Sequence, residues 1–406
     1  MLPSPRIEAV STASRTRRLS AFYAAHFAGL GIFGPYGPAL LSALGLDAAG
    51  IGWAFGLYNF ARIAAMPLGA AWGETRIGLA RTIVWCSAAT AACLAALGFA
   101  HGLSAITLVM VALSIVRAPV IPITDGLAMA HAAGDGGGRP AGERPTYASM
   151  RAWGSFAFLV AAGLGGVALT GASATTLALA MTLTAVAAAV AAFFVVAPVP
   201  KPRHADSARE PFRPGRRLVA TIVAAALVQG SHGMVATFGT LHWTARGFPG
   251  ALVGGAWAAA VATEIAVLSL SGRVGVAPRH GPALMLAGAA AGTIRWIAMG
   301  FDPPGWGVLA LQSLHGGSFA MTFLGSALAV DQAAGEGRRA RAQGALATAS
   351  AVANACAVMA SGPLYARFGE RAYLAMAAMT AAGFALTAAL AALPARAPLS
   401  RPGPAL

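Results

Sequence analysis

Charged side chains are scarce in this sequence. Asp, Glu, Lys and Arg together make up 10% of its 406 residues, whereas 57% of the residues are hydrophobic. Soluble domains contain about 25% charged residues, and the mean hydropathy of this chain is +0.68. The composition therefore predicts a polytopic membrane protein, with no room beside its apolar runs for a large soluble domain.

Motifs that would indicate an enzyme, a metal site or a nucleotide site are also lacking. Cys86, Cys93 and Cys356 all lie in apolar segments without CxxC spacing, and we interpret them as packing residues. The sequence has no GxxxxGK[ST] loop, no HExxH and no aspartates four residues apart in an apolar run. We therefore expect no enzyme, no cofactor and no metal, and ATP-driven transport is disfavoured. A receptor or scaffold that binds a ligand without moving it is a different class that stays open.

The net charge of +15 is carried by short basic clusters between the apolar runs. This distribution is typical of loops on one side of a membrane, so we expect a lipid bilayer and no nucleic acid as partner. The basic clusters occupy alternate breaks, and the other breaks contain only Arg246, Arg367 and Arg371. Because Lys and Arg accumulate on the cytoplasmic side, both termini are expected to be cytoplasmic, in a bacterial inner membrane.

Twelve apolar windows are long enough to be transmembrane helices, each of which needs about 20 residues. They lie near 20–42, 49–72, 80–99, 103–130, 147–170, 174–197, 218–242, 251–271, 282–301, 307–331, 343–365 and 371–393. The expected fold class is therefore an all-α membrane protein of twelve transmembrane helices. Its longest hydrophilic break is Pro-rich and basic, and it predicts a linker between two six-helix halves. The expected regions are a tail (1–19), a first half (20–197), a linker (198–217), a second half (218–393) and a tail (394–406).

The two halves resemble each other in sequence. Aligning GIGWAFGLYNFARIA (50–64) with LVGGAWAAAVATEIA (252–266) pairs Gly52 with Gly254 and Arg62 with Glu264. Two similar six-helix halves are typical of transporters built from parallel repeats, which bind their substrate near the membrane midplane between the halves.

Three consecutive spans of the second half each carry one ionisable residue, His232, Glu264 and Arg295. A charge at mid-bilayer depth costs about 3 kcal/mol unless it meets a partner or a wet cavity. Structural pairing between helices would explain any one of these residues, but three together favour a polar pathway through the membrane.

An excess of buried positive charge suggests an anionic substrate. Arg62 and Arg117 are expected near the midplane, where Glu264 is the one acidic residue expected beside them. This excess is costly unless an anion completes it or the arginines extend to water, and a substrate carboxylate would bind a guanidinium through two hydrogen bonds. The candidate substrate-binding residues are Arg62, Arg117, His232, Trp257, Arg295 and His315.

Two carboxylates are candidates for coupling transport to protons. Glu264 is preferred, because a carboxyl group in a partly dry cavity can hold a proton that a nearby arginine displaces. A static bridge between Glu264 and an arginine is the alternative. Asp125 is the second candidate, and it is also expected to form a gating or structural ion pair with Arg151, since both lie near the cytoplasmic ends of their spans.

Several segments resemble a known transporter family. They are PITDGLA (122–128), YASMRAWGSFAFL (147–159), QGSHGMVATFGTLHW (229–243), GAWAAAVATEIAVL (255–268), IRW (294–296), LQSLHGGSFAMTFLGSA (311–327) and SGPLYARFG (361–369). Together they resemble the major facilitator superfamily, in the grouping of phenylpropionate permeases, nucleoside–proton symporters and lactose permease. The resemblance implies functional roles for Arg151, Glu264, Arg295 and His315.

Two segments depart from that pattern. GAAWGETRIGLAR (69–81) is a degenerate form of the superfamily signature Gly-x-x-x-Asp-Arg-x-Gly. In the sugar permeases a glutamate three residues after the tenth-span histidine carries the coupled proton, whereas Ser318 follows His315 here. Lactose is therefore not expected as the substrate, and proton coupling would use Glu264 or Asp125 or be absent.

The sequence thus predicts a secondary transporter that moves a small organic solute by alternating access and works as a monomer. An aromatic or other carboxylate moved together with a proton is the preferred substrate class. A nucleoside–proton or sugar–proton symporter, or an efflux antiporter for amphipathic compounds, is the alternative.

Overall fold

The computed structural model describes residues 12–134, 146–195, 212, 214–334 and 337–393, and all regular structure in these ranges is helical. The α-helices of the first part of the chain are α1 (Thr12–Ala43), α2 (Ala48–Trp72), α3 (Leu79–Leu97), α4 (Gly102–Arg117), α5 (Val120–Gly134), α6 (Tyr147–Leu169) and α7 (Ala174–Phe193). Those of the second part are α8 (Arg216–Gly230), α9 (Gly233–Ala245), α10 (Gly250–Val274), α11 (Gly281–Met299), α12 (Gly305–Ser313), α13 (Thr322–Ala334), α14 (Arg339–Phe368) and α15 (Tyr373–Ala392).

Each expected span coincides with one helix or with consecutive helices. The spans 103–130, 218–242 and 307–331 each contain a break: α4 leads to α5, α8 to α9, and α12 to α13 through the π-helix η4 (Gly316–Met321). Eight helical segments of the described chain are long and apolar enough to cross a membrane, and one of them contains both α14 and α15. The all-helical membrane fold is thus confirmed, while the count of twelve spans stays a prediction.

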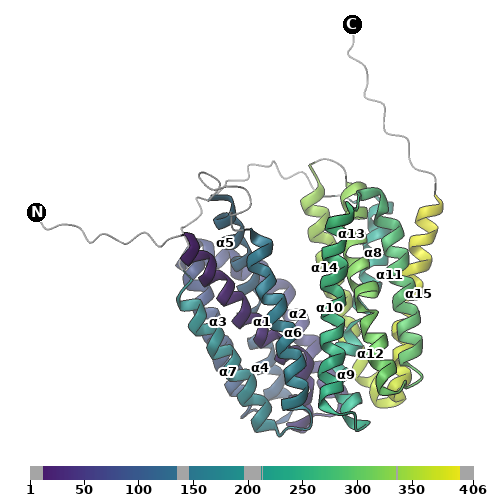
Figure 1. Ribbon diagram of the computed structural model, residues 1–406. Helices are drawn as coiled ribbons and strands as arrows, with labels where there is room; N and C mark the ends of the chain where they lie inside the picture. The colour runs from purple at the N-terminus through teal and green to yellow at the C-terminus, as the bar shows by residue number, and fades with distance from the viewer. Residues whose placement is uncertain (1–11, 135–145, 196–211, 213, 335–336, 394–406) are drawn as a thin grey trace, which may run out of the picture.

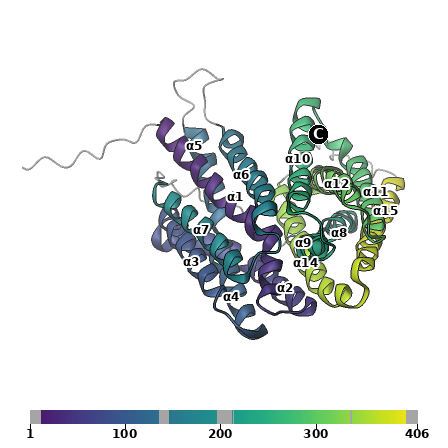
Figure 2. The same cartoon turned by 60° about the horizontal axis from the view of Figure 1, so that its bottom comes forward.

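The helices form two bundles that lie side by side, α1–α7 and α8–α15 (Figures 1 and 2). The first residue of α1 and the last residue of α15 lie at the same end of the molecule, which we call the terminal end, and we call the opposite end the closed end (Figure 1). The bundles span Thr12–Phe193 and Arg216–Ala392, while the expected halves 20–197 and 218–393 stay predictions. Most of the linker 198–217 and the whole tail 394–406 lie outside the described residues, and α1 begins within the expected tail 1–19.

The halves meet near the closed end through α2 against α14 and α6 against α10. Glycines allow this approach, because a Cβ on Gly52 would lie 2.7 Å from Gly362 Cα, and one on Gly166 would overlap the backbone of Gly254. Gly52 and Gly254, paired by the sequence repeat, thus occupy equivalent contacts between the halves. Towards the terminal end the two bundles diverge (Figure 1).

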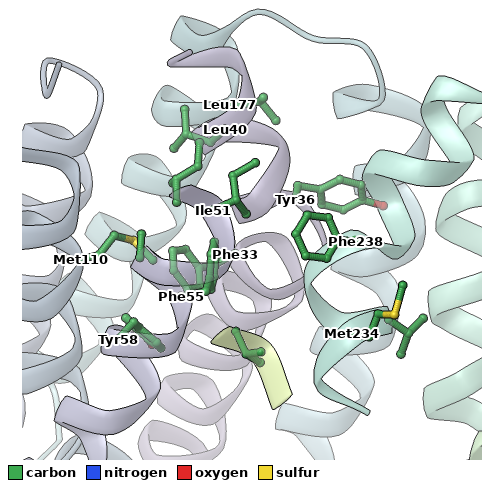
Figure 3. Close-up of a cluster of buried hydrophobic side chains, with 14 of the residues drawn as sticks. Phe33, Tyr36, Leu40, Ile51, Phe55, Tyr58, Met110, Leu177, Met234 and Phe238 are labelled. Atoms are coloured by element: carbon green, nitrogen blue, oxygen red, sulfur yellow. The ribbon is translucent and has the colours of Figure 1, made fainter. Parts of the chain in front are cut away.

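An apolar core joins the halves at these contacts. Phe33, Phe55 and Tyr58 of the first half are buried in the same cluster as Met234 and Phe238 of the second half (Figure 3). Lipid is as apolar as these side chains, so close packing rather than exclusion from water is what holds them together.

A polar cluster fixes the closed end of the second half. Asp302, in the loop between α11 and α12, accepts hydrogen bonds from Arg246 Nη1 at 2.6 Å and His242 Nε2 at 3.0 Å. His242 Nδ1 lies 3.0 Å from the Tyr365 hydroxyl of α14. Asp302 has a φ of 56°, the one positive φ of a non-glycine residue in the described chain. The cluster therefore ties the ends of α9, α11 and α14 to one another.

The breaks inside spans have local causes. Pro119 comes directly after Ala118, the C-cap of α4, and has no N–H to donate to the preceding turn. Between α8 and α9, Ser231 Oγ donates to the carbonyl of Val228 at 2.7 Å, and the same carbonyl lies 3.1 Å from His232 Nδ1. These side chains compete with the backbone for its carbonyl groups, and glycines flank them on both sides. Each break places polar residues in the interior of a half.

Candidate functional site

The second half contains a buried polar cluster around Arg295 of α11, whose side chain has no exposed surface. Its Nη1 donates to Ser318 Oγ at 3.1 Å and to His315 Nδ1 at 3.2 Å, and its Nη2 donates to Gln312 Oε1. Ser318 Oγ also lies 3.1 Å from His232 Nε2. Residues from α11, α12, η4 and the α8–α9 break therefore form one hydrogen-bonded network.

The donors of this network set the tautomers of both histidines. Arg295 can only donate, so His315 Nδ1 must accept, and a neutral His315 carries its proton on Nε2. His232 Nδ1 faces the carbonyls of Val228 and Gln229 and must donate, so its Nε2 accepts from Ser318.

Glu264 of α10 lies at the edge of this network. Its Oε2 is 3.6 Å from His315 Nε2, the nitrogen that carries the proton, and 29% of its side chain is exposed. His315 in turn stacks on Phe319, with ring centroids 4.9 Å apart. His315 therefore separates the carboxyl group of Glu264 from the buried guanidinium of Arg295, and this carboxyl group is partly exposed.

Trp257 shares α10 with Glu264 and precedes it by two helical turns, so the two residues lie on similar faces of the helix. Its indole N–H donates to Thr240 Oγ1 at 2.9 Å, and its ring packs near Trp243. The indole donor is thus engaged within the second half, while the residue as a whole is half-buried.

In the first half, Asp125 and Arg151 form the ion pair expected from the sequence. Asp125 Oδ1 lies 3.7 Å from Arg151 Nε and accepts a hydrogen bond from the Tyr23 hydroxyl at 2.6 Å. The Arg151 guanidinium covers the ring of Phe27 at 4.0 Å from its centroid. Arg151 of α6 and Glu264 of α10 lie on two helices from opposite halves that pack against each other.

Arg62 and Arg117 lie elsewhere in the first half. Arg62 is exposed on α2, whereas Arg117 is buried at the end of α4 and covers the ring of Phe33 at 4.9 Å. The two arginines act on each other electrostatically. Glu264 contacts His315 of the second half instead, so the structure does not bring Arg62, Arg117 and Glu264 together as a midplane group.

Two members of the network were not among the residues selected from the sequence as binding or coupling candidates. Gln312 is fully buried and accepts from Arg295, and Ser318 links Arg295 to His232. Both are uncharged, so a search for ionisable residues passes over them. Their spacing was a usable signal, because Gln312, His315 and Ser318 recur at every third position of one span.

The two-bundle helical fold and the buried polar network in its second half are those of a membrane transporter of the major facilitator type. The chain belongs to the MFS_1 like family, whose model matches residues 16–375. It is 27% identical over 328 residues to the probable 3-phenylpropionic acid transporter of Escherichia coli (strain K12), with 76% of this chain and 80% of that protein covered. The resemblance in the sequence is thus confirmed.

Solved transporters share the fold at lower identity. The nucleoside transporter NupG superposes with a TM-score of 0.76 and 15% identity, over 94% of this chain and 100% of that one. An auto-inhibited POT family peptide transporter gives a TM-score of 0.67 and 13% identity, over 96% and 98% of the two chains. A bacterial homolog of the human lysosomal transporter Spinster, inward-facing and occupied, gives 0.62 and 15%, over 93% of each.

Proposed function

We propose that this transporter moves a small carboxylate, preferably an aromatic one, together with a proton. The observation that carries the proposal is the uncompensated charge of Arg295. Its partners Gln312, Ser318 and His315 are neutral, and it forms no ion pair with a carboxylate within the described residues. Its Nε has no hydrogen-bond partner. A buried guanidinium in this state lacks one anion.

A substrate carboxylate has the chemistry to complete this site. Two parallel N–H donors of a guanidinium match the two oxygens of a carboxylate, and the free Nε–H of Arg295 supplies one donor of such a fork. An approach through His315 and Glu264 would bring the carboxylate to this donor, since the partly exposed Glu264 contacts His315, which in turn contacts Arg295. The aromatic preference rests on the name of the relative that is 27% identical.

Coupling to a proton follows from the same geometry. While Glu264 is ionised, it attracts the Nε2–H of His315 and holds this ring against Arg295. A proton taken up by Glu264 removes that attraction, so His315 can turn away and expose the guanidinium to the substrate. Release of the substrate restores the original pair and returns the proton. Glu264 is thus the proposed coupling residue, and the pair of Asp125 with Arg151 is the proposed gate.

The proposed orientation has both termini on the cytoplasmic side of a bacterial inner membrane, as the basic residues in alternate loops favour. The described conformation then opens towards the cytoplasm, because its halves diverge at the terminal end (Figure 1). The protein is proposed to act as a monomer, since each half contributes one side of the site.

A symporter for a nucleoside or sugar, or an antiporter for amphipathic compounds, is the alternative. Gln312, Ser318 and His232 offer neutral hydrogen-bonding groups that suit a hydroxylated solute. A preference for anions over neutral solutes separates the two proposals.

Uptake of labelled 3-phenylpropionate into proteoliposomes, with and without an inward proton gradient, tests the proposal. We expect accumulation that depends on the gradient and is lost in Glu264→Gln, while exchange of internal for external substrate persists. Glu370→Gln, in the 3₁₀-helix η5 (Gly369–Ala372) between α14 and α15, serves as control and should accumulate like the wild type. Unchanged accumulation by Glu264→Gln would exclude Glu264 as the coupling residue. Transport of nucleosides without transport of acids would favour the alternative.

A further inference from the structure

A small cavity lies inside the first half, apart from the network around Arg295. Its volume is about 10 Å³, room for about one water-sized particle. It is enclosed by α1, α3, α4 and α7. Polar side chains are spread around its wall: His26, Ser87, Thr90, Arg117 and Thr184 all line it.

Arg117 contributes a buried positive charge to this cavity. Its side chain is 7% exposed, and its Nε and Nη1 have no hydrogen-bond partner. The titratable groups that act on it are the hydroxyl of Tyr58, with which it forms a hydrogen bond, and the like-charged Arg62. No carboxylate pairs with Arg117 within the described residues. Its charge is therefore uncompensated by protein side chains.

Ser87 and Arg117 have donors without partners at the cavity, whereas the hydroxyl groups of Thr90 and Thr184 can only accept there. Thr90 and Thr184 spend their hydroxyl hydrogens on the carbonyls of Cys86 and Met181, at 2.8 and 2.9 Å. Ser87 Oγ has no partner and, like the free N–H groups of Arg117, has a hydrogen to donate. A cation would be repelled here. A water molecule would accept these hydrogens but would leave the charge in place.

The surrounding charges increase the need for an anion. Arg62, Arg117 and Arg151 all act electrostatically on His26, which lines the cavity. Asp125 is already engaged by Arg151 and by the hydroxyl of Tyr23. The C-terminal end of α4, where Arg117 lies, offers only about half an elementary charge. Positive charge therefore remains in excess around this cavity.

We propose that the cavity binds one small inorganic anion of the size of chloride, held by Arg117 and Ser87. The room available excludes an organic acid, so this site is distinct from the substrate site proposed at Arg295, and neither depends on the other. An anion at this position would contact α1, α3, α4 and α7 at once. It would therefore stabilise the first half and make the stability of the transporter depend on halide.

Thermal unfolding of the purified transporter tests this site. Sodium gluconate is replaced by sodium chloride or bromide at constant ionic strength, and the midpoint is followed as a function of halide concentration. We expect a saturable rise for both halides that is absent in Arg117→Gln. Arg295→Gln is the matched control, because it removes a buried arginine from the other half, and it should keep the halide-dependent rise. Ser87→Ala removes one donor and should increase the half-saturating concentration about threefold to tenfold.

Bromide also gives a direct test through its anomalous scattering in crystals. We expect an anomalous peak in the cavity within hydrogen-bonding reach of Arg117. A midpoint that does not saturate with halide, or the same rise in Arg117→Gln, would show that the cavity holds water only. Should Arg117→Gln not fold, the bromide peak and the shifted half-saturation of Ser87→Ala decide the question, and absence of both overturns the proposal.

Discussion

Arg117 and Arg295 place one buried positive charge in each half, and their surroundings differ. Arg295 uses three neutral partners, and its Nε has no hydrogen-bond partner. Arg117 has an aromatic ring and a tyrosine hydroxyl beside it and keeps two nitrogens without partners. Removing a partner from a buried charge destabilises the protein. The groups that contact each guanidinium therefore determine which ligand it can bind.

Gln312→Glu tests what Arg295 lacks. The new carboxylate would take the place of the amide oxygen that already accepts from Arg295 Nη2, and it would supply the missing negative charge. We expect thermal stability to rise by about 1–3 kcal/mol, while the KM for carboxylate uptake rises about tenfold or more because the substrate must displace an internal anion. Thermal unfolding and uptake kinetics measure the two effects.

Gln312→Leu is the matched variant, because it removes the acceptor without adding charge. It should lower stability by about 2–3 kcal/mol, the cost of leaving a charged donor buried without a partner. Unchanged KM in Gln312→Glu would show that the substrate carboxylate does not bind at Arg295.

Ionisable residues of the second half were the part of the network that the sequence could predict. A charge inside an apolar run is visible in any window, as His232, Glu264 and Arg295 were. The neutral members were not, because an amide or a hydroxyl in a span is common and its partner depends on how helices turn. The same limit explains why Arg62 and Arg117 were grouped with Glu264. The position of a residue along a span indicates its depth in the membrane but not the direction in which its side chain points.

Helices α6 and α10 illustrate what single elements contribute. Their glycines bring the backbones of the two halves into contact, and equivalent glycines do so for α2 and α14. The sequence predicted these spans well, because about 20 apolar residues in a row have few alternatives to a helix. The repeat pairs Gly52 with Gly254, but the sequence alone does not show which atoms each glycine faces. Gly34 and Gly255 have open space around them, whereas Gly52 and Gly254 are enclosed by backbone atoms of the other half.

Gly166→Ala should force the halves apart at the closed end. A Cβ there would overlap the backbone of Gly254 and Gly250, which cannot yield as a flexible side chain can. Gly163→Ala on the same helix is the control, since its Cβ would meet only Ala258 Cβ at an ordinary 3.7 Å. We expect Gly166→Ala to shift the population towards a conformation that is open at the closed end, and Gly163→Ala to leave it unchanged.

Spin labels at Thr175 of α7 and Phe301 of the α11–α12 loop report this change, because both residues are exposed at the closed end in opposite halves. The native cysteines Cys86, Cys93 and Cys356 are first replaced by serine. A longer distance in Gly166→Ala and an unchanged one in Gly163→Ala is the expected result. The same label-to-label distance in Gly166→Ala and Gly163→Ala would contradict the backbone contact of Gly166 with Gly250 and Gly254.

The molecule as a whole consists of two bundles whose contacts lie near the closed end (Figures 1 and 2). The polar cluster around Asp302 keeps α9, α11 and α14 fixed there within the second half. Arg151 and Glu264 lie on α6 and α10, the helices of opposite halves that pack against each other. The halves were predictable from the repeat and the basic break between them, but their relative tilt was not, because both conformations of an alternating-access transporter share one sequence.

Rotation of the halves as rigid bodies predicts opposite changes at the two ends of the molecule. Arg81 is exposed in the first turn of α3, and Arg273 is exposed in the last turn of α10. Spin labels at these two residues therefore report the terminal end. Under 3-phenylpropionate and low pH, a carboxylate bound to Arg295 and a protonated Glu264 favour closure around the substrate. The distance between labels at Arg81 and Arg273 should then shorten while that between Thr175 and Phe301 lengthens. Distance changes of the same sign at both ends would mean that the halves bend internally. Such a result would contradict a rigid rotation of the halves about their glycine contacts.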